Sequence, residues 1–277
     1  MNILFWNTLR SNRKHIDKVN DCIIDLISEK ECDIVILAEY NGAVEDICHL
    51  QNVGQKEEFC LIPNFGGCDR IRGLIKKKYQ IKNLCEQTHY QISIIETSLY
   101  KLIIAMIHNR SKLYGSEEIQ KENLRRLHYD ICEEERKHNT QNSIIIGDFN
   151  ANPFEPSFVS ANSLHAIPFL DEVKKNTRIV LDKEYQKFYN PTWKFFGKRE
   201  TPYSTYYYNN SDMYNIYWNV FDQIIIRPQL IEAFIDDSLT IIHETKNHSL
   251  LRAKKPDKEN YSDHLPLFCA LEEGKIK

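Results

Sequence analysis

One segment of the sequence places a carboxylate and an amide directly after a run of apolar residues. Residues 143–150 read Ser-Ile-Ile-Ile-Gly-Asp-Phe-Asn, so the β-branched run stops at Gly147 and is followed by Asp148 and Asn150. Residues two apart share one face of an extended chain. The spacing therefore predicts two short polar side chains together at the carboxyl end of a buried strand.

A second segment supplies an acid and an imidazole. Residues 262–268 read Ser-Asp-His-Leu-Pro-Leu-Phe, so Asp263 and His264 stand just before the apolar run 267–271. Carboxylate, amide and imidazole groups are what a metal-assisted attack on a phosphodiester needs. These two segments therefore point to hydrolytic chemistry at a phosphate.

Polar residues also occur at the ends of other apolar runs. A single buried strand that ends in an acid is ordinary, but several in one chain are hard to assign to chance. Strand ends on one rim of a sheet converge on a shared site. The further candidates are Asn7, Glu39, His108 and Asp222.

The elements that would position these groups can be read from periodicity. Helical spacing of apolar residues predicts helices over 14–30 and 116–138, and 151–181 reads as irregular with helical pieces. Strands outnumber helices, and both halves show a similar order, which favours two sheets packed face to face with helices outside. The predicted strands are 2–6, 33–39, a strand and its turn within 70–82, 91–97, 101–107, 143–147, 222–227, 239–243 and 267–271.

Composition bounds the class of protein. The chain has 277 residues, 42% of them hydrophobic, which suits one large domain with ample core, and we expect a single domain over 1–277. The net charge of -3 argues against a protein that coats nucleic acid through bulk charge. It leaves room for an enzyme that touches a few phosphates.

The cysteines and the first residues bear on the compartment. Eight cysteines occur without a Cys-x-x-Cys pair, so we expect reduced thiols and a cytoplasmic protein. The start has no basic region followed by a long apolar run, so we expect no signal peptide. No apolar stretch reaches the ~20 residues of a membrane span, and no segment points to a protein partner, so we expect a monomer.

The pieces above, taken in order, resemble the endonuclease/exonuclease/phosphatase superfamily, whose fold is that of pancreatic-type deoxyribonuclease. The match spans nearly the whole chain, and its strongest parts are Gly-Asp-Phe-Asn and Ser-Asp-His-x-Pro. The resemblance implies a four-layer α/β sandwich of two mixed, mainly antiparallel sheets, with the site at one rim. The matching pieces are Trp6-Asn7, Ala38-Glu39, His108, Gly147-Asp148-Phe149-Asn150, Phe221-Asp222-Gln223 and Ser262-Asp263-His264-Leu265-Pro266.

The resemblance also implies roles for the residues that bind the metal and activate water. Glu39 would bind Mg²⁺ or Mn²⁺, and Asp263 would complete the metal site or its surrounding acids. Asn7 would help place the metal or the phosphate. Asp148 would orient and deprotonate the attacking water, while Asn150 would hold the phosphate.

The same resemblance assigns the imidazoles. His264 would contact the phosphoryl oxygen, and Asp222 would fix its tautomer and charge. His108 would stabilise the pentavalent transition state or protonate the leaving oxygen. Arg110 shares a face with His108 and is either a phosphate contact or a solvated side chain.

Departures from the family's pattern narrow the choice of branch. Many members have Gln where this chain has Ala38. Abasic-site enzymes place an Asp where this chain has Leu9, and a Tyr where it has His108. These differences argue against an abasic-site repair enzyme and leave the deoxyribonuclease-like and phosphodiesterase-like branches open.

Residues 185–218 hold 13 of the 31 aromatic residues of the chain. Large rings usually fill a core, as we expect for Trp193 and Trp218. Three tyrosines in a row at 206–208 have no room to point inward together, and a tyrosine beside the site could stack a base. We take Tyr207 as the candidate substrate contact. The basic run at 70–82 is read as a solvated face rather than a phosphate track.

The sequence therefore predicts a Mg²⁺- or Mn²⁺-dependent phosphodiester hydrolase. A nuclease acting on DNA or RNA is favoured, so nucleic acid is the expected partner. The alternative is a phosphodiesterase or phosphatase for a small molecule or lipid head group. A catalytically inactive binding module is a remote alternative, since its signature would be loss of Asp148 or His264.

Overall fold

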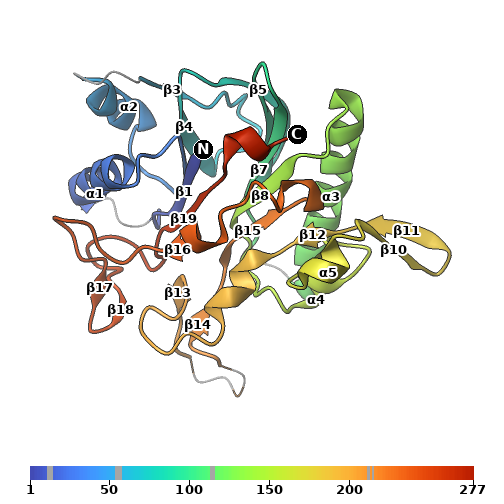
Figure 1. Ribbon diagram of the computed structural model, residues 1–277. Helices are drawn as coiled ribbons and strands as arrows, with labels where there is room; N and C mark the ends of the chain where they lie inside the picture. The colour runs from blue at the N-terminus through green and yellow to red at the C-terminus, as the bar shows by residue number, and fades with distance from the viewer. Residues whose placement is uncertain (11–14, 54–57, 113–115, 211–212, 214) are drawn as a thin grey trace.

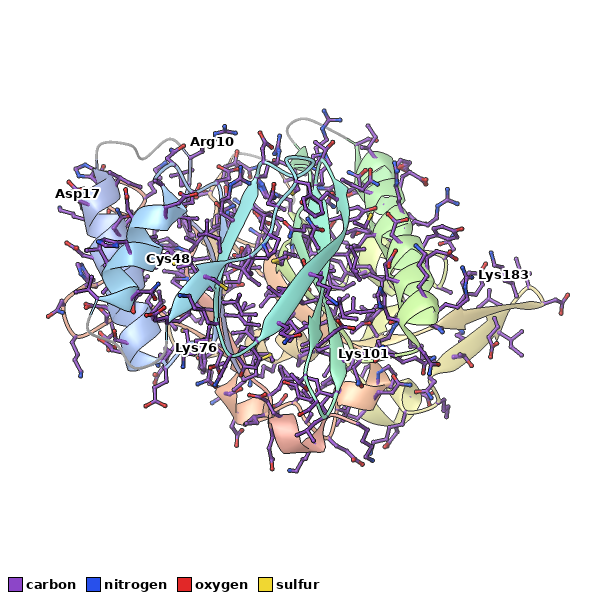
Figure 2. All side chains as sticks on the ribbon, turned by 90° about the horizontal axis from the view of Figure 1, so that it is seen from above. Arg10, Asp17, Cys48, Lys76, Lys101 and Lys183 are labelled. Carbon is purple, nitrogen blue, oxygen red and sulfur yellow. The ribbon has the colours of Figure 1, made fainter. Side chains whose placement is uncertain are left out.

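The computed structural model describes residues 1–10, 15–53, 58–112, 116–210, 213 and 215–277. Two large β-sheets lie face to face, with helices on both outer sides (Figure 1). The edge-on view of Figure 2 shows the order of layers: α1 and α2, one sheet, the second sheet, then α3. This is the four-layer α/β sandwich that the sequence predicts. The helices are α1 (Ile16–Glu29), α2 (Val44–Asn52) and α3 (Glu117–His138).

The first sheet has six strands and is mixed. Its β1 and β2 run parallel, and every other neighbouring pair is antiparallel. The strand order is β16 (Thr240–Ile241), β19 (Leu267–Ala270), β1 (Asn2–Asn7), β2 (Ile34–Ala38), β4 (Ile71–Lys76) and β3 (Phe59–Leu61).

The second sheet has seven strands and is also mainly antiparallel. Its parallel pairs are β7 with β8 and β12 with β9. The strand order is β5 (Gln80–Gln87), β6 (Tyr90–Glu96), β7 (Lys101–His108), β8 (Ser143–Asp148), β15 (Asp222–Ile226), β12 (Phe188–Tyr189) and β9 (Ala166–Ile167).

Three hairpins and several short helices complete the described part of the chain. The hairpins are β10 (Thr177–Val180) with β11 (Lys183–Gln186), β13 (Tyr206–Tyr207) with β14 (Trp218–Asn219), and β17 (Leu251–Arg252) with β18 (Lys255–Pro256). The short helices are α4 (Pro156–Val159), α5 (Leu170–Val173), and the 3-10 turns η3 (Pro191–Phe195), η4 (Pro228–Leu230), η5 (Asp236–Ser238) and η6 (Glu273–Lys275).

The central strands of the second sheet are buried on both faces. In β7 the side chains of Ile104 and Met106 pack into the core between the sheets, whereas Ile103 and Ala105 pack into the core beneath α3. Alternate side chains of a strand point to opposite faces, so a strand covered on both sides reads as a continuous apolar run. This is why the runs at 101–107, 143–147 and 222–227 lack polar alternation.

Helix α3 covers the outer face of the second sheet with Leu124, Leu127 and Ile131, spaced as one helical stripe. Ser116 caps its amino end by accepting a hydrogen bond from the Ile119 backbone N–H. Asn139 ends it in the left-handed conformation, with φ of 52°. Local sequence signals therefore define both ends of the helix.

The structure confirms most of the predicted elements and corrects some bounds. The predicted strand 239–243 shortens to Thr240–Ile241. The irregular stretch 151–181 contains two strands, β9 and β10, besides its helical pieces, because each pairs with a strand beyond position 181. Helix α2 and strand β3 were not predicted. All eight cysteines are free, and no helix among the described residues is long and apolar enough to cross a membrane.

Candidate active site

The sheet topology brings the candidate residues to one rim. Strands β1, β2, β7 and β8 end there, and the antiparallel strands β15 and β19 begin there. A cleft of about 910 Å³ opens at this rim. Asp222 lies fully buried behind the cleft lining. The predicted residues that line the cleft are Asn7, Glu39, His108, Arg110, Asp148, Asn150, Asp263 and His264.

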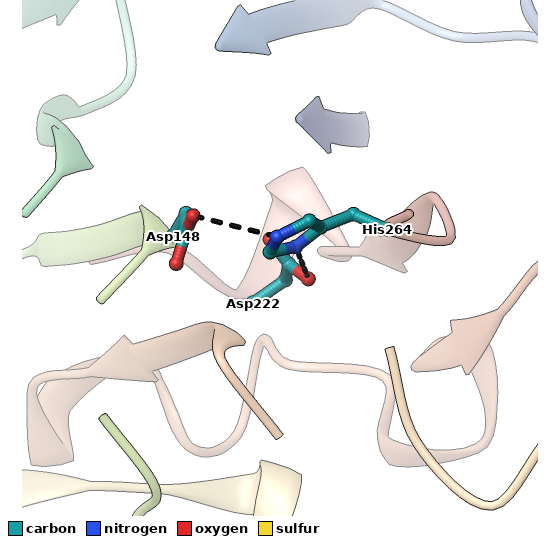
Figure 3. A group of neighbouring side chains, drawn as sticks. All are labelled: Asp148, Asp222 and His264. Atoms are coloured by element: carbon teal, nitrogen blue, oxygen red, sulfur yellow. Dashed lines mark hydrogen bonds and ion pairs between the residues drawn. The ribbon is translucent and has the colours of Figure 1, made fainter. Parts of the chain in front are cut away.

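A series of contacts joins Asp222, His264 and Asp148 (Figure 3). The Nδ1 atom of His264 lies 2.8 Å from Oδ2 of Asp222, and its Nε2 atom lies 3.9 Å from Oδ2 of Asp148. All three residues are buried. The imidazole thus bridges two carboxylates, one on each of its nitrogens. We call these three residues the strand-end relay.

The surroundings shift the pKa values of the relay strongly. Burial alone would lower the pKa of His264, but the carboxylates of Asp222 and Asp148 outweigh it and raise the value to about 10. Burial raises the pKa of Asp148 to about 7, although the His264 charge opposes the shift. At neutral pH the imidazole is therefore a cation, and Asp148 titrates near neutrality.

Amide groups also hold Asp148, two of them at the carboxylate oxygen that faces His264. Asn7 donates from Nδ2 to Oδ2 of Asp148 at 2.9 Å. The Asn150 backbone N–H donates to Oδ1 at 2.8 Å, and its Nδ2 donates to Oδ2 at 3.2 Å. The pairing of Asp148 with Asn150 predicted from their spacing is thus a local turn that orients the carboxylate.

Glycine is required directly before Asp148. Gly147 has φ of +152°, and a Cβ at this position would lie 1.9 Å from the backbone oxygen of Ile107. Strands β7 and β8 approach too closely there for any side chain. The Gly-Asp-Phe-Asn sequence therefore combines a close approach of backbones with the carboxylate that this approach positions.

Glu39 and His108 form a second pair across the cleft. Nε2 of His108 lies 3.2 Å from Oε1 of Glu39 and 3.7 Å from Oδ2 of Asp148. Burial lowers the pKa of His108 to about 4 despite the nearby Glu39, so the ring is neutral at pH 7. Its Nδ1 is buried without a hydrogen-bond partner in the described ranges, which fits a tautomer with the proton on Nε2.

Two donor sets at this rim could hold a metal. The buried atoms of Asp148, Asp222 and His264 lie within 4.8 Å of one another, but the 2.8 Å hydrogen bond between His264 and Asp222 already uses two of them. Glu39 is less buried, lines the cleft and offers only oxygen ligands, as hard divalent cations prefer. Its Oε2 is held by the Arg10 backbone N–H at 3.1 Å. The chemistry of the donors therefore favours metal binding at Glu39.

Neighbouring residues fix the segments that carry the site. Ser262 donates from Oγ to the Asn7 carbonyl at 2.6 Å and accepts from the His264 N–H at 3.1 Å. The side-chain amide of buried Gln120, on α3, donates to the carbonyls of Arg110 and Asn150. The helix and the Ser-Asp-His segment therefore hold together loops that are far apart in the sequence.

The lining of the cleft combines basic and aromatic groups. Arg10, Arg70 and Arg110 are among its residues, and neither the Arg70 nor the Arg110 guanidinium has a hydrogen-bond or carboxylate partner among the residues placed by the structure. Tyr206 also lines the cleft, with its ring 4.6 Å from that of His264.

Sequence reasoning missed Arg70 and Tyr206. Arg70 was read as part of a solvated run, yet it precedes β4 and its carbonyl accepts from the Glu39 N–H at 3.0 Å, which places it at the rim. Tyr206 pairs with His264, whereas the candidate Tyr207 packs against Trp218 and outside the cleft lining. Knowledge of strand pairing would have identified both.

No family model matches the sequence, and no curated protein matches it. Solved structures do match. TDP2 of D. rerio complexed with single strand DNA product is 17% identical with a TM-score of 0.57, over 98% of each chain.

Two proteins of Bacteroides thetaiotaomicron match at 12% identity. An endonuclease/exonuclease/phosphatase family protein has a TM-score of 0.54 over 98% of this chain and 97% of its own. A mannosyl-6-phosphatase has a TM-score of 0.56 over 98% and 99%. At such identities these likenesses speak to the fold alone.

Proposed function

We propose that this chain, which has the endonuclease/exonuclease/phosphatase superfamily fold, is a metal-dependent phosphodiester hydrolase that cleaves nucleic acid. The observation that carries the proposal is the strand-end relay at the bottom of an open cleft. It couples a cationic imidazole to a carboxylate that titrates near neutral pH.

The relay accounts for both proton movement and charge. Asp148 orients a water molecule and takes its proton as the water oxygen bonds to phosphorus, for which a pKa near working pH is best. His264 donates to the phosphoryl oxygen on which negative charge develops, and Asp222 keeps it protonated. The ester P–O bond breaks as the leaving oxygen takes a proton from solvent water, and Asp148 then returns its proton to solvent. Asn7 and Asn150 hold the base and the phosphate in line.

Glu39 and Asp263 would hold a Mg²⁺ or Mn²⁺ ion, since both line the cleft and supply only oxygen ligands. Such an ion, when bound, supplies Lewis-acid polarisation of the phosphoryl oxygen. His108 is neutral and its Nε2 atom lies 3.2 Å from Oε1 of Glu39, which supports a role in positioning that carboxylate more than one as a proton donor.

The arginines that line the cleft favour nucleic acid as the substrate. Arg70 and Arg110 lie beside the relay without carboxylate or carbonyl partners in the described chain, so they are available to phosphates on either side of the scissile one. A polymer of phosphates can contact both arginines at once, whereas a single phosphate occupies one position. The single strand DNA complex of the similarly folded TDP2 supports this choice.

A phosphatase or phosphodiesterase for a small molecule is the second candidate. The likeness to a mannosyl-6-phosphatase, over nearly the whole of both chains, favours it. Such an enzyme would use the same relay and the same metal ligands, Glu39 and Asp263. It would not require Arg70 and Arg110 together, because one phosphate occupies one position.

The decisive experiment is metal-dependent turnover of a substrate panel: supercoiled plasmid, single-stranded DNA, RNA, bis-p-nitrophenyl phosphate and mannose 6-phosphate, each with and without EDTA. Asp148→Asn serves as the inactive variant, and Asp182→Asn, on the exposed β10–β11 turn, is the matched control. Nucleic-acid cleavage that EDTA and Asp148→Asn both stop, and that the control retains, supports the proposal. Turnover of only the small esters supports the second candidate.

The setting of the enzyme follows from weaker features. The eight free cysteines fit a reducing compartment, and we propose the cytoplasm. We also propose a monomer with one domain over 1–277, which sedimentation and limited proteolysis would test.

A further inference from the structure

Tyr206, which lines the cleft, belongs to an ordered stack of three rings. The ring of Tyr206 lies 5.1 Å from that of Phe221 at an interplanar angle of 22°, and 6.3 Å from that of Tyr208 at 16°. Parallel, offset rings at these separations are stacked. Since no ring contact joins Phe221 to Tyr208 in the described chain, Tyr206 is the middle ring. We call Phe221, Tyr206 and Tyr208 the aromatic ladder.

The ladder begins at the catalytic imidazole and ends in solvent. Tyr206 forms an isolated bridge with His264, and their rings are 4.6 Å apart. Tyr208 lies two residues on, on the same face of the strand, and is 44% exposed. A row of rings therefore leads from His264 through the cleft-lining Tyr206 to the exposed ring of Tyr208.

The opposite face of the same hairpin is closed. Tyr207 packs against Trp218 at 5.4 Å and Tyr217 at 6.4 Å, and Lys255 lies 4.4 Å above its ring. The Tyr207 ring therefore has contacts within the protein. The exposed ring that stacks on the cleft-lining Tyr206 is that of Tyr208.

We propose that Tyr208 stacks an unpaired base of the substrate, a nucleotide next to the scissile phosphate, so that the enzyme selects single-stranded nucleic acid. This inference rests on the proposed nuclease function and specifies its substrate. A base within a duplex has both faces covered by its neighbours, whereas a single strand can place a base on an aromatic ring while its phosphates contact Arg70 and Arg110, which line the same cleft as Tyr206.

The test combines a change in the protein with a change in the substrate. Tyr208→Leu removes the aromatic face, Tyr208→Phe keeps it, and Tyr203→Leu makes the same change at an exposed tyrosine that packs on Trp218. The substrates are single-stranded oligonucleotides with one base at a time replaced by an abasic spacer, and a matched duplex.

Stacking is worth ~1–3 kcal/mol per base, so Tyr208→Leu is expected to raise KM for single strands about 5- to 150-fold. Tyr208→Phe should restore it, and Tyr203→Leu should match the wild type. At one spacer position the losses from spacer and Tyr208→Leu should fail to add, because they remove the same contact.

Additive losses at every position, or a wild type that cleaves duplex as well as single strands, would overturn the inference while leaving the nuclease proposal intact. A wild type that hydrolyses only small esters would overturn both. The two failures are therefore distinguishable.

Discussion

The strand-end relay and the aromatic ladder meet at His264 but are supported in opposite ways. Asp148 and Asp222 lie on neighbouring central strands of the second sheet, in direct register, and both are buried at its rim. Tyr206 and Tyr208 lie on or beside the two-residue strand β13, which pairs with the equally short β14 outside the two large sheets and forms a bridge with His264. The carboxylates proposed to perform chemistry are thus held by the central strands of a sheet, and the rings proposed to bind substrate by a local hairpin.

The difference implies that changes in the relay affect the chemical step and that changes in the ladder affect binding. Asp148 and Asp222 are fixed by cross-strand pairing, so a substitution there should remove a function without freeing the segment. The hairpin is a local structure, so substitutions there are expected to alter substrate choice while the relay remains. The expectations below test this contrast from the largest effect to the smallest.

Removal of the base should have the largest effect. Asp148→Asn keeps the shape of the side chain and removes its ability to take a proton, so kcat should fall about 10³- to 10⁴-fold with KM little changed. Single-turnover kinetics on single-stranded DNA, beside Asp182→Asn, measure this. A loss confined to KM would place Asp148 in binding and erase the contrast between the two regions.

Asp222→Asn should reduce kcat about 10²- to 10³-fold and also shift the alkaline limb of the pH–rate profile to lower pH. The carboxylate raises the pKa of His264 to about 10, so wild-type activity persists until the pH rises through that value. With Asp222 neutralised, less negative charge opposes the effect of burial, so the His264 pKa should fall and activity should be lost at a lower pH. The stability that the pair contributes is fully present below the unfolded value of about 6.5 and is lost as the pH rises through about 10.

The pH–rate profile of kcat, with thermal melting at each pH, measures both effects. Asp237→Asn, an exposed acid, is the matched control. An unchanged alkaline limb in Asp222→Asn would mean that His264 is not the titrating group.

His108 should affect metal binding by a smaller factor. His108→Phe removes the Nε2 atom that lies beside Glu39 while keeping a ring. The Mn²⁺ or Mg²⁺ concentration at half-maximal activity should therefore rise about 10- to 100-fold. His108→Gln, whose amide can donate, should recover part of the loss. Direct Mn²⁺ binding by electron paramagnetic resonance checks affinity without turnover, and equal metal binding by both variants would instead favour contact of His108 with the substrate.

Most of the fold and the relay could be predicted from sequence because they depend on patterns that sequence records directly. Runs buried on both faces are unmistakable, and polar residues at their ends, such as Asp148, must lie at a rim. Short strands such as β13 depend on pairing with distant segments, so neither their existence nor their facing side is encoded locally. A shift of one residue separates Tyr207 from Tyr206, and a one-residue shift exchanges the two faces of a strand.

The smallest expected effect tests the closed face of the hairpin. Lys255 lies over the Tyr207 ring at an exposed position, where such a contact is worth about 0.5–1 kcal/mol. Lys255→Met should therefore lower the melting temperature by about 1–4 °C and leave kcat/KM for single-stranded DNA unchanged. Lys258→Met, three residues further on and also exposed, is the control. A fall in kcat/KM without a change in melting temperature would show that substrate reaches the Tyr207 face, and would favour Tyr207 over Tyr208 as the residue that meets the base.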